Sequence, residues 1–419
     1  MRDPVNREAT DLANDIAITH ILDARPYLID LKRAGEAIPD LDPDDILHAG
    51  PPFAPTDDLC SALRGAIVGT LVIEGRAPNL DAAQEMARSE RLRLRSAAEV
   101  NATCTFGGVI TAATPVFVVE NRAFGTQAFS AINEGRGAAL RYGSTATETL
   151  ERVRWLHGEF TTVLGAAIRS LGGIDMFGLM GQALAMGDEL HSRQKAASAL
   201  FLATVASTVC EHAPTLTSAS STLAFLANND FFFLPLAMAS AKSVMSAVEN
   251  IENSSIVTAI AFNGAKCGIR VSGLDNWCTA SIPRISGHYF HGFDERVAGP
   301  VIGDSEIMET LGLGALAMAN APSLARYLSG RSAFGADLTR EMYETTVSEH
   351  PLFKVPYLDE RGTPLGIDVR KVTATRIAPA FNTGIAHIDV GIGQIGAGYG
   401  RVPLECFDNA AKRLTATGR

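Results

Sequence analysis

The chain lacks the sequence features that are typical of secreted, membrane-spanning or cysteine-rich metal-binding proteins. Its six cysteines are scattered, with no C-x-x-C pair, and reduced thiols are expected rather than a disulfide framework. The longest apolar run lies near Phe231–Ala241 and is too short to cross a bilayer, which requires about 20 apolar residues. The polar N-terminus has no signal-peptide core. We therefore expect a soluble, cytoplasmic protein.

Basic runs are also absent. The net charge is -10, with 36 Lys and Arg against 46 Asp and Glu. Nucleic acids and anionic membrane surfaces are bound by clustered Lys and Arg, so the composition predicts that neither is a partner. Hydrophobic residues make up 47% of the chain and charged residues 20%, which is typical of a compact globular protein. At 419 residues, two or three domains are expected.

Hydrophobic periodicity and turn residues predict an α+β protein, in which a small helical domain is inserted into a multi-domain mixed α/β fold. We expect three units: an N-terminal α/β domain over 1–144, a helical subdomain over 145–213, and a C-terminal α/β domain over 214–419. Expected helices run to about residue 37 and over 81–90, 236–250 and 304–322; expected strands cover 44–53 and 114–121, with a hairpin around Asn263 and Gly264.

The segment PAFNTGIAHIDVGIGQIGAG, at 379–398, concentrates glycines near its end. It contains G-x-G-x-x-G, but too few residues follow it to complete a dinucleotide-binding βαβ unit, so that interpretation fails. Two interpretations remain open: a turn that packs backbone on backbone, or a nest of backbone N–H groups that binds an anion. In the second, the candidate ligand-binding residues are Asn382, His387, Gly391, Gly393, Gly396 and Gly398.

The segment LAMGDELHSRQKA, at 184–196, places acidic, basic and imidazole groups close together. On a helix, Asp188 and His191 would share a face, so Asp188 could fix the tautomer of His191. Arg193 could hold an anionic group. We take Asp188, His191, Arg193 and His387 as candidate catalytic residues. The alternative is a charged, solvent-facing helix start with no catalytic role.

Other segments supply candidate substrate contacts. Asp368 and Arg370 fall on one face of a strand expected over 366–372. Asp304 opens the helix expected over 304–322, whose N-terminus could bind an anion or could simply be capped. Asn263, at the expected hairpin turn, is a further candidate. His288 and His291 share no face and lack further ligands, so no metal site and no cofactor are predicted.

Many of these strings occur in an order that resembles a known family. The strings are LHAGPP, RGAIVGTLVIEG, TPVFVVEN, INEGRGAALRYG, MGDELHSR, NNDFFFLPLAMA, SSIVTAIAFNG, GIRVSG, GDSEIMETLGLGALAMA, GTPLGIDVRKV and NTGIAHIDVGIGQIGAG. The chain resembles the YlbE/YahG-like family, which includes the AllG subunit of oxamate carbamoyltransferase. The resemblance covers nearly everything from about Asn14 to Cys406.

The resemblance implies a role in purine (allantoin) nitrogen catabolism, with carbamoyl transfer between oxamate and phosphate. In the catabolic direction, oxalurate and phosphate would give oxamate and carbamoyl phosphate. It also implies FdrA-like and AllH-like partner subunits, and leaves a homo-oligomer open. On this basis the glycine-rich loop and Arg370 would hold phosphate or carboxylate, while His191 or His387 would polarise the carbamoyl oxygen.

Two departures from the family pattern bear on the substrate. Ser192 stands where the family has Asn, and residues 97–105 read AAEVNATCT where the family tends to have histidines. Two alternatives to the oxamate activity therefore stay open. The chain could be a non-catalytic scaffold or regulatory subunit of an FdrA-like complex, or it could act on a different ureido or amide compound.

Overall fold

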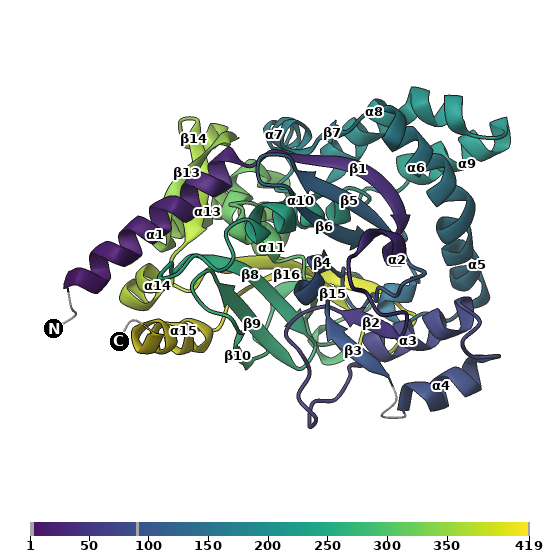
Figure 1. The fold of residues 1–419 in the computed structure, drawn as a ribbon, viewed down its shortest axis with the longest axis horizontal. Helices are drawn as coiled ribbons and strands as arrows, with labels where there is room; N and C mark the ends of the chain where they lie inside the picture. The colour runs from purple at the N-terminus through teal and green to yellow at the C-terminus, as the bar shows by residue number, and fades with distance from the viewer. Residues whose placement is uncertain (1–3, 89–91, 418–419) are drawn as a thin grey trace.

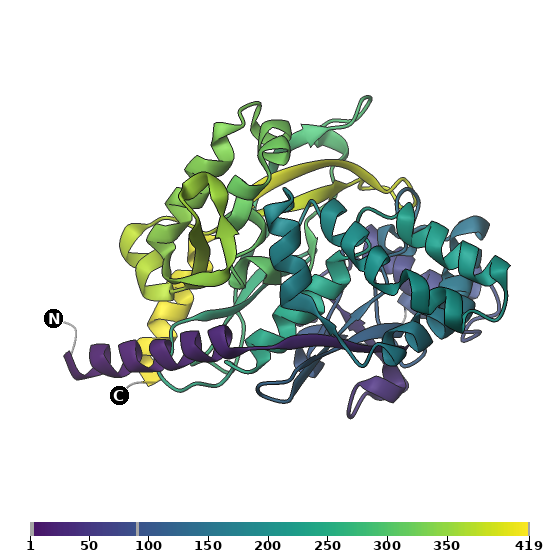
Figure 2. The ribbon, with the colours of Figure 1, turned by 90° about the horizontal axis from the view of Figure 1, so that it is seen from above.

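The computed structural model describes residues 4–88 and 92–417, and it confirms a mixed α+β fold (Figure 1). Three sheets of three to five strands and two small two-stranded sheets are packed among the helices. Helix α1 (Pro4–Asp23) extends from the body on the side where the C-terminal helix α15 (Leu404–Thr417) also lies (Figures 1 and 2). No helix in the described ranges is long and apolar enough to cross a membrane.

The largest sheet has five strands in the order β4-β6-β5-β1-β7. Because side chains alternate along a strand, β5 buries Phe117 and Val119 with helices α6 and α10, whereas Val116 and Val118 pack toward α3 and β2. The strands are β1 (Pro26–Arg33), β4 (Ala102–Thr103), β5 (Pro115–Asn121), β6 (Thr126–Ala131) and β7 (Ile174–Asp175); β2 (Asp45–His48) pairs separately with β3 (Arg93–Ser96), in parallel.

Two further sheets lie in the second half of the chain. The predicted hairpin at Asn263 is confirmed, because β8 and β9 pair antiparallel around it. The four-stranded sheet has the order β10-β9-β8-β12 and the three-stranded sheet β11-β16-β15. Their strands are β8 (Val257–Asn263), β9 (Lys266–Val271), β10 (Cys278–Ser281), β11 (Ser286–Tyr289), β12 (Ile302–Gly303), β15 (Ala380–Ala386) and β16 (Gln394–Arg401).

The region predicted to be helical contains four helices and one short strand, β7. A π-helical segment, Leu156–Phe160, joins α5 to α6, and α5, α6, α8 and α9 gather at one edge of the molecule (Figure 1). The largest hydrophobic cluster contains Leu28, Phe201 and Phe353, one from each predicted domain. The helices are α5 (Thr147–Trp155), α6 (Thr161–Ser170), α7 (Met176–Ala185), α8 (Lys195–His212) and α9 (Leu216–Ala227).

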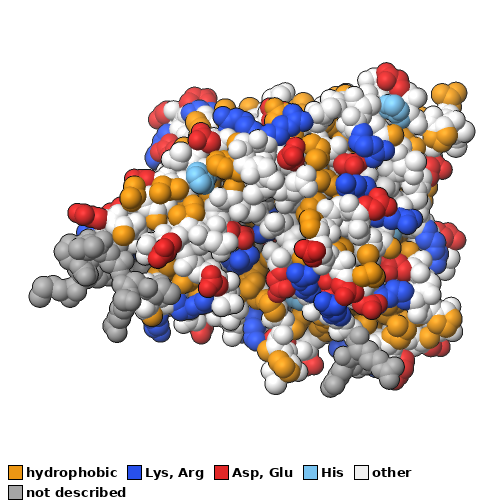
Figure 3. Space-filling model, in the orientation of Figure 1, with side chains coloured by type: hydrophobic (Ala, Val, Ile, Leu, Met, Phe, Trp, Pro, Cys, Tyr) orange, Lys and Arg blue, Asp and Glu red, His pale blue; other side chains and the backbone are white. Residues whose placement is uncertain are grey.

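The remaining elements complete both ends of the fold. The face in Figure 3 intersperses Lys and Arg with Asp and Glu. The remaining α-helices are α2 (Ala34–Ala37), α3 (Ser61–Ile73), α4 (Leu80–Arg88), α10 (Leu234–Ser246), α11 (Ile307–Thr310), α12 (Pro322–Ser329), α13 (Ala333–Met342) and α14 (Val369–Thr375). The last strand pair is β13 (Thr346–Val355) with β14 (Arg361–Ile367). Residues 89–90 of the helix predicted over 81–90 lie outside the described part.

Three predicted elements were wrong. The first helix ends at Asp23 and strand β1 follows it, so helix does not continue to residue 37. The helix predicted over 304–322 is broken into α11 and a 3-10 segment, Gly314–Asn320. The break arises because Gly312, between them, and Gly314, at the start of the second, take positive φ angles of 79° and 59°. The strand predicted over 366–372 ends at Ile367, and helix α14 begins directly after Asp368.

Candidate active site

The segment 188–194 forms a buried loop between α7 and α8 rather than the predicted helix. Leu190 has a φ of 70° and Gly187 a φ of 101°, values that an α-helix cannot accommodate. Asp188, Glu189 and His191 are all buried. The loop therefore carries polar side chains into the interior, which requires that each of them find partners there.

Glu189 organises this loop. Its carboxylate accepts hydrogen bonds from three consecutive backbone N–H groups, those of His191 at 2.6 Å, Ser192 at 2.6 Å and Arg193 at 2.8 Å. Burial raises the pKa of Glu189 to about 7, although His191 and these N–H groups favour the charged form. The Glu189 carboxyl consequently links three successive residues of the loop.

The imidazole of His191 is partnered by Glu309 of α11. Nδ1 lies 2.9 Å from Oε1 of Glu309 and 3.1 Å from Oε2. The sequence prediction that Asp188 orients this ring was wrong. Asp188 instead accepts a hydrogen bond from the N–H of Ala197 at the start of α8 and lies 3.5 Å from Nε of Arg193. The helix assumed for the prediction does not exist, so the i, i+3 relationship is lost.

Three buried carboxyls surround the His191 ring. Burial alone would lower the pKa of His191, but Glu309, Glu306 and Glu189 together raise it to about 9. Burial raises the pKa of Glu306 to about 8, opposed by the charge of His191. At neutral pH the ring is therefore an imidazolium. Nδ1 donates to Glu309, no described residue partners Nε2, and a cavity lies beside the side chain.

Asn382 of β15 connects this loop to the three-stranded sheet. Its Nδ2 donates to Oγ of Ser192 at 2.7 Å and to Oε1 of Glu189 at 3.3 Å. Arg193 is more peripheral: Nε donates to the carbonyl of Gly187 at 3.0 Å, and the side chain is 38% exposed. The structure therefore brings Asn382 and His191 to one place, as part of one network.

The cavity beside His191 has a volume of about 200 Å³. That is below the roughly 300–1,000 Å³ of pockets for drug-sized ligands, and it suits a small molecule. Its walls come from stretches that are far apart in the sequence, and they mix polar with aromatic side chains. They include Thr105, Phe106, Asn133, Arg141, Tyr142, His191, Ser192, Phe231, Phe290, Ser305, Tyr327, Thr383 and Gln394.

Two residues that border the cavity, Ser305 and Arg141, and the His191 partner Glu309 were not among the predicted site residues. Glu309 and Ser305 lie in GDSEIMET, where only Asp304 had been selected, and Arg141 lies in INEGRGAALRYG, from which no residue had been selected. The available signal was polar or charged residues set inside otherwise apolar, glycine-containing strings. Nothing in the sequence showed which of these strings meet in space.

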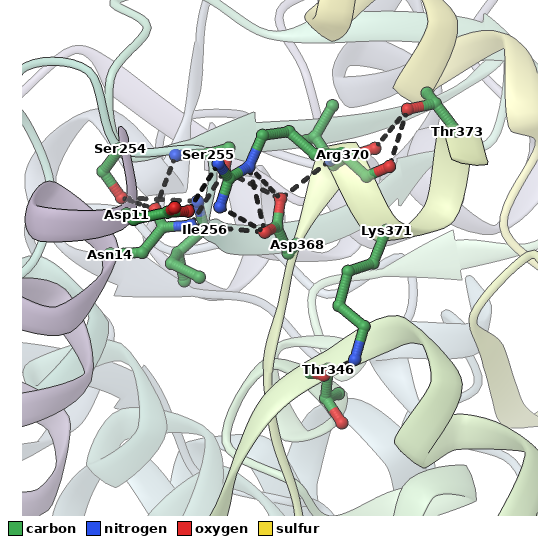
Figure 4. Close-up of polar contacts among 11 residues, drawn as sticks. Asp11, Asn14, Ser254, Ser255, Ile256, Thr346, Asp368, Arg370, Lys371 and Thr373 are labelled. Atoms are coloured by element: carbon green, nitrogen blue, oxygen red, sulfur yellow. Dashed lines mark hydrogen bonds and ion pairs between the residues drawn. The ribbon is translucent and has the colours of Figure 1, made fainter. Parts of the chain in front are cut away.

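Arg370 and Asp368 lie in a separate network (Figure 4). Nη1 of Arg370 contacts Asp11 at 2.7 Å and Nη2 contacts Asp368 at 3.0 Å, and neither residue borders the His191 cavity. Asp368 caps α14 and accepts hydrogen bonds from Ser255 and Asn14. The N–H groups of this guanidinium thus join α1 to the start of α14, and the structure does not bring Arg370 to the cavity.

The glycine-rich segment is the turn between β15 and β16. Gly391 and Gly393 have positive φ angles of 84° and 93°, and the N–H of Gly391 donates to the carbonyl of Tyr142. Gly396 and Gly398 lie within β16, the central strand of its sheet, where an added Cβ at Gly398 would come within 2.5 Å of Ile285 and Ser286. These two glycines therefore allow strands to approach closely, and an N–H nest that includes them is not formed.

Three other candidates have structural partners. Nδ1 of His387 accepts a hydrogen bond from the N–H of Asp389, and the ring packs against Phe293. Asp304 accepts from the N–H groups of Gly50 and Cys104, and burial raises its pKa to about 7. Asn263 accepts from the N–H groups of residues 265 and 266 within the hairpin turn. None of the three borders the cavity, and their predicted role in substrate binding stays a prediction.

Comparison with known proteins places this architecture. The chain is 39% identical over 408 residues to "Oxamate carbamoyltransferase subunit AllG" of Escherichia coli (strain K12), an alignment that covers 96% of this chain and 97% of the relative. The model of the family described as "Oxamate carbamoyltransferase subunit AllG" matches residues 92–305. The chain belongs to the AllG family.

Two further relatives of this AllG-family chain agree. "Uncharacterized protein YahG" of Escherichia coli (strain K12) is 35% identical, covering 95% of this chain and 84% of the relative. A crystal structure of a conserved protein of unknown function from Enterococcus faecalis V583 superimposes with a TM-score of 0.96 at 36% identity, covering 99% of this chain and 100% of the other. The predicted family is confirmed, and the function it supports is that of a carbamoyltransferase subunit.

Across the residues that the structure describes, no group of three or more His, Cys, Asp and Glu side chains is arranged to hold a metal ion. The carboxyls near His191 instead interact with its ring and with backbone N–H groups. The chemistry available at the cavity from this chain is hydrogen-bond donation from an imidazolium and from neutral polar groups, together with one guanidinium.

Proposed function

We propose that this chain carries a carbamoyl-transfer site of an oxamate carbamoyltransferase, in which the imidazolium of His191 polarises the carbamoyl oxygen. The observation that carries the proposal is the buried His191–Glu309 pair, whose Nε2 is left without a described partner beside a small cavity. A charged donor fixed in a water-poor site stabilises the oxyanion that develops when a carbonyl carbon is attacked.

In the catabolic direction, the attacking oxygen of monohydrogen phosphate forms a bond to the ureido carbonyl carbon of oxalurate. The bond from that carbon to the amide nitrogen then breaks. The proton carried by the phosphate passes to the departing nitrogen, giving oxamate and carbamoyl phosphate with atoms and charge balanced. Nε2–H of His191 donates to the oxyanion throughout and need not lose its proton, since the pKa of His191 is raised to about 9.

The pathway and partners belong to the same proposal. Oxalurate and oxamate are products of purine (allantoin) degradation, and the resemblance to this family implies FdrA-like and AllH-like subunits in the complex. The 39% identical relative is named as a subunit, which supports a multi-chain enzyme. The proposal places the phosphate or carbamoyl phosphate in the His191 cavity and does not require a metal.

Carbamoyl phosphate formation from oxalurate and phosphate, measured with the complex assembled from co-expressed subunits, tests this function. The His191→Gln variant should assemble normally and lose most of its turnover. Unchanged turnover in His191→Gln would show that this chain is a scaffold or regulator, with the chemistry on another subunit. The same assay on Arg193→Ala and His387→Ala tests the two remaining catalytic candidates, and the geometry predicts that both retain turnover.

A different ureido or amide substrate is favoured by one observation. Thr105 and Ser192 both border the cavity, and both lie where the sequence departs from the family pattern. Turnover of a panel of ureido acids with phosphate separates the two possibilities. Preference for oxalurate supports oxamate chemistry, whereas preference for a larger or neutral ureido compound would assign the site to another substrate.

A further inference from the structure

A buried guanidinium borders the cavity without an acidic partner. Arg141 lies in the 3-10 turn Leu140–Tyr142 and is only 6% exposed. Its Nη2 donates to the carbonyl oxygen of Gly135 at 2.6 Å, and its guanidinium carbon lies 4.6 Å from the centre of the Tyr142 ring. Nη1 is buried and has no hydrogen-bond partner among the described residues. The side chain is therefore held in place through Nη2, while its Nη1 donors remain available to a ligand.

Burying such a group without a counter-charge is unfavourable. Arginine stays charged at any physiological pH, and an isolated charge removed from water carries a large desolvation penalty. Within the described ranges, Arg141 forms no ion pair with an Asp or Glu side chain. The carboxylate nearest to it in sequence, Glu134, accepts from the backbone N–H groups of Leu140 and Arg141. Glu134 thus fixes the backbone of Arg141, and an external anion would complete the charge balance.

The position of Arg141 relates it to the His191 site. Arg141 and His191 both border the cavity of about 200 Å³, and Arg141 also borders a smaller adjoining cavity of about 50 Å³. Thr105 is shared by the two cavities as well. Among the residues that border the larger cavity, Arg141 and the His191 imidazolium are the basic side chains. Two cationic groups at separate points can hold two anionic parts of a reacting pair.

A carboxylate fits Arg141 better than a phosphate does. A guanidinium binds a carboxylate through parallel N–H donors, and the single positive charge matches a single negative charge. A phosphate dianion would need a second nearby cation. The smaller cavity that Arg141 also borders is instead bordered by the acidic Glu134 and by His157, whose pKa burial lowers to about 4. The cation–π contact with the Tyr142 ring further fixes the position of the guanidinium.

We propose that Arg141 binds the carboxylate of the carbamoyl acceptor, and so restricts the substrate to small amido or ureido acids whose carboxylate adjoins the amide carbonyl. This inference rests on the proposed function, because it assigns the acceptor to the same cavity as His191. Arg141 holds the acid end, and the amide nitrogen is directed toward the carbamoyl carbon beside His191. Neutral diamides of the same shape would leave the guanidinium without an anion and be rejected.

Binding of oxamate and of its neutral isostere oxamide tests the inference by titration calorimetry and by ligand-dependent melting temperature, on the purified chain and on the co-expressed complex. Wild-type protein should bind oxamate about 100-fold or more tightly than oxamide. Arg141→Gln should lose that preference by weakening oxamate binding, and Arg141→Lys, which keeps the charge but not the fork, should retain part of it. Inorganic phosphate is titrated in parallel.

Arg152→Gln is the matched control, because Arg152 also donates to a backbone carbonyl in the same region, that of Ala138, but does not border either cavity. It should keep the wild-type preference. Equal binding of oxamate and oxamide by wild type would overturn the inference whether or not Arg141→Gln folds, as would loss of phosphate binding alone in Arg141→Gln. His191→Gln separates the two proposals: it should bind oxamate normally while losing turnover. If it turns over normally, the proposed function fails while Arg141 can still be judged by the oxamate preference.

Discussion

Nδ1 of His191 lies 2.9 Å from Oε1 of Glu309, a residue 118 positions further along the chain. The pair fixes both the orientation and the charge of the imidazole, since Glu309 is fully buried and its charge acts on the ring with little solvent screening. This relationship occupies Nδ1 and leaves Nε2 as the ring nitrogen that can act on a ligand, which underlies the first two predictions.

Removal of the imidazolium should reduce catalysis without removing the acceptor. His191→Gln is expected to lower kcat by about 10²- to 10³-fold, the range seen when one oxyanion donor is deleted. The binding of oxamate, measured by titration, should change little. The control is Arg193→Gln, which alters a partly exposed neighbour and should leave kcat close to wild type. A normal kcat in His191→Gln would show that Nε2 does not act on the reacting group.

The pH dependence should follow the charge of His191. Burial lowers and the surrounding carboxylates raise its pKa, with a result of about 9, so the donor is present below that pH and is lost as pH rises through it. We expect kcat to decline on the alkaline side near pH 9. Glu309→Gln removes the carboxylate that contacts the His191 ring, and it should move the decline in kcat to lower pH.

Asp188→Asn provides the comparison for this pH profile, since Asp188 contacts the start of α8 rather than the His191 ring. It should leave the alkaline decline where it is. A shift of equal size in Asp188→Asn and Glu309→Gln would show that the His191–Glu309 pair has no special part in the titration. The same linkage applies to stability: the contribution of His191 is present below its unfolded pKa of 6.5 and is lost as pH rises through about 9.

Arg370 should prove structural. Its guanidinium joins Asp11 of α1 to the buried Asp368 (Figure 4), so Arg370→Met should lower stability by about 1–3 kcal/mol. Melting curves with and without oxamate measure this, and the ligand-induced rise should equal that of wild type. Arg376→Gln, at the exposed pair with Asp408, should have a smaller effect. Loss of the oxamate-induced rise in Arg370→Met alone would restore the original binding prediction.

Gly398 is expected to be required for strand packing. A Cβ at this position would approach Ser286 O and Ile285 Cγ2 to 2.5 Å, so Gly398→Ala should destabilise the protein by about 1–3 kcal/mol through overpacking. Gly158→Ala is the matched control, because an added Cβ there meets nothing within 4 Å. Thermal melting compares the two variants. Unchanged stability of Gly398→Ala combined with weaker phosphate binding would instead support an anion site at this segment.

Local sequence signals were sufficient for several elements of the fold. The β-branched run before Asn121 predicts β5, the Asn263–Gly264 turn predicts the β8–β9 hairpin, and the apolar repeat after Leu236 predicts most of α10. These elements depend on alternation, turn chemistry and helical periodicity, which are properties of neighbouring residues. The ordered motifs also sufficed for the family, because many short strings in one order are specific together.

The site itself was decided by tertiary structure. The sequence by itself selected His191 and Asn382, since a histidine among charged residues and an asparagine near glycines are visible locally. It could not supply Glu309 or Arg141, because their importance arises from packing that removes them from water beside a cavity built by distant segments. In the described part of the chain, packing makes Glu309 the partner of His191 and leaves the Arg141 side chain without an acidic partner. This difference between Glu309 and Arg141 depends on which distant segments pack together, and the tertiary structure alone decides that.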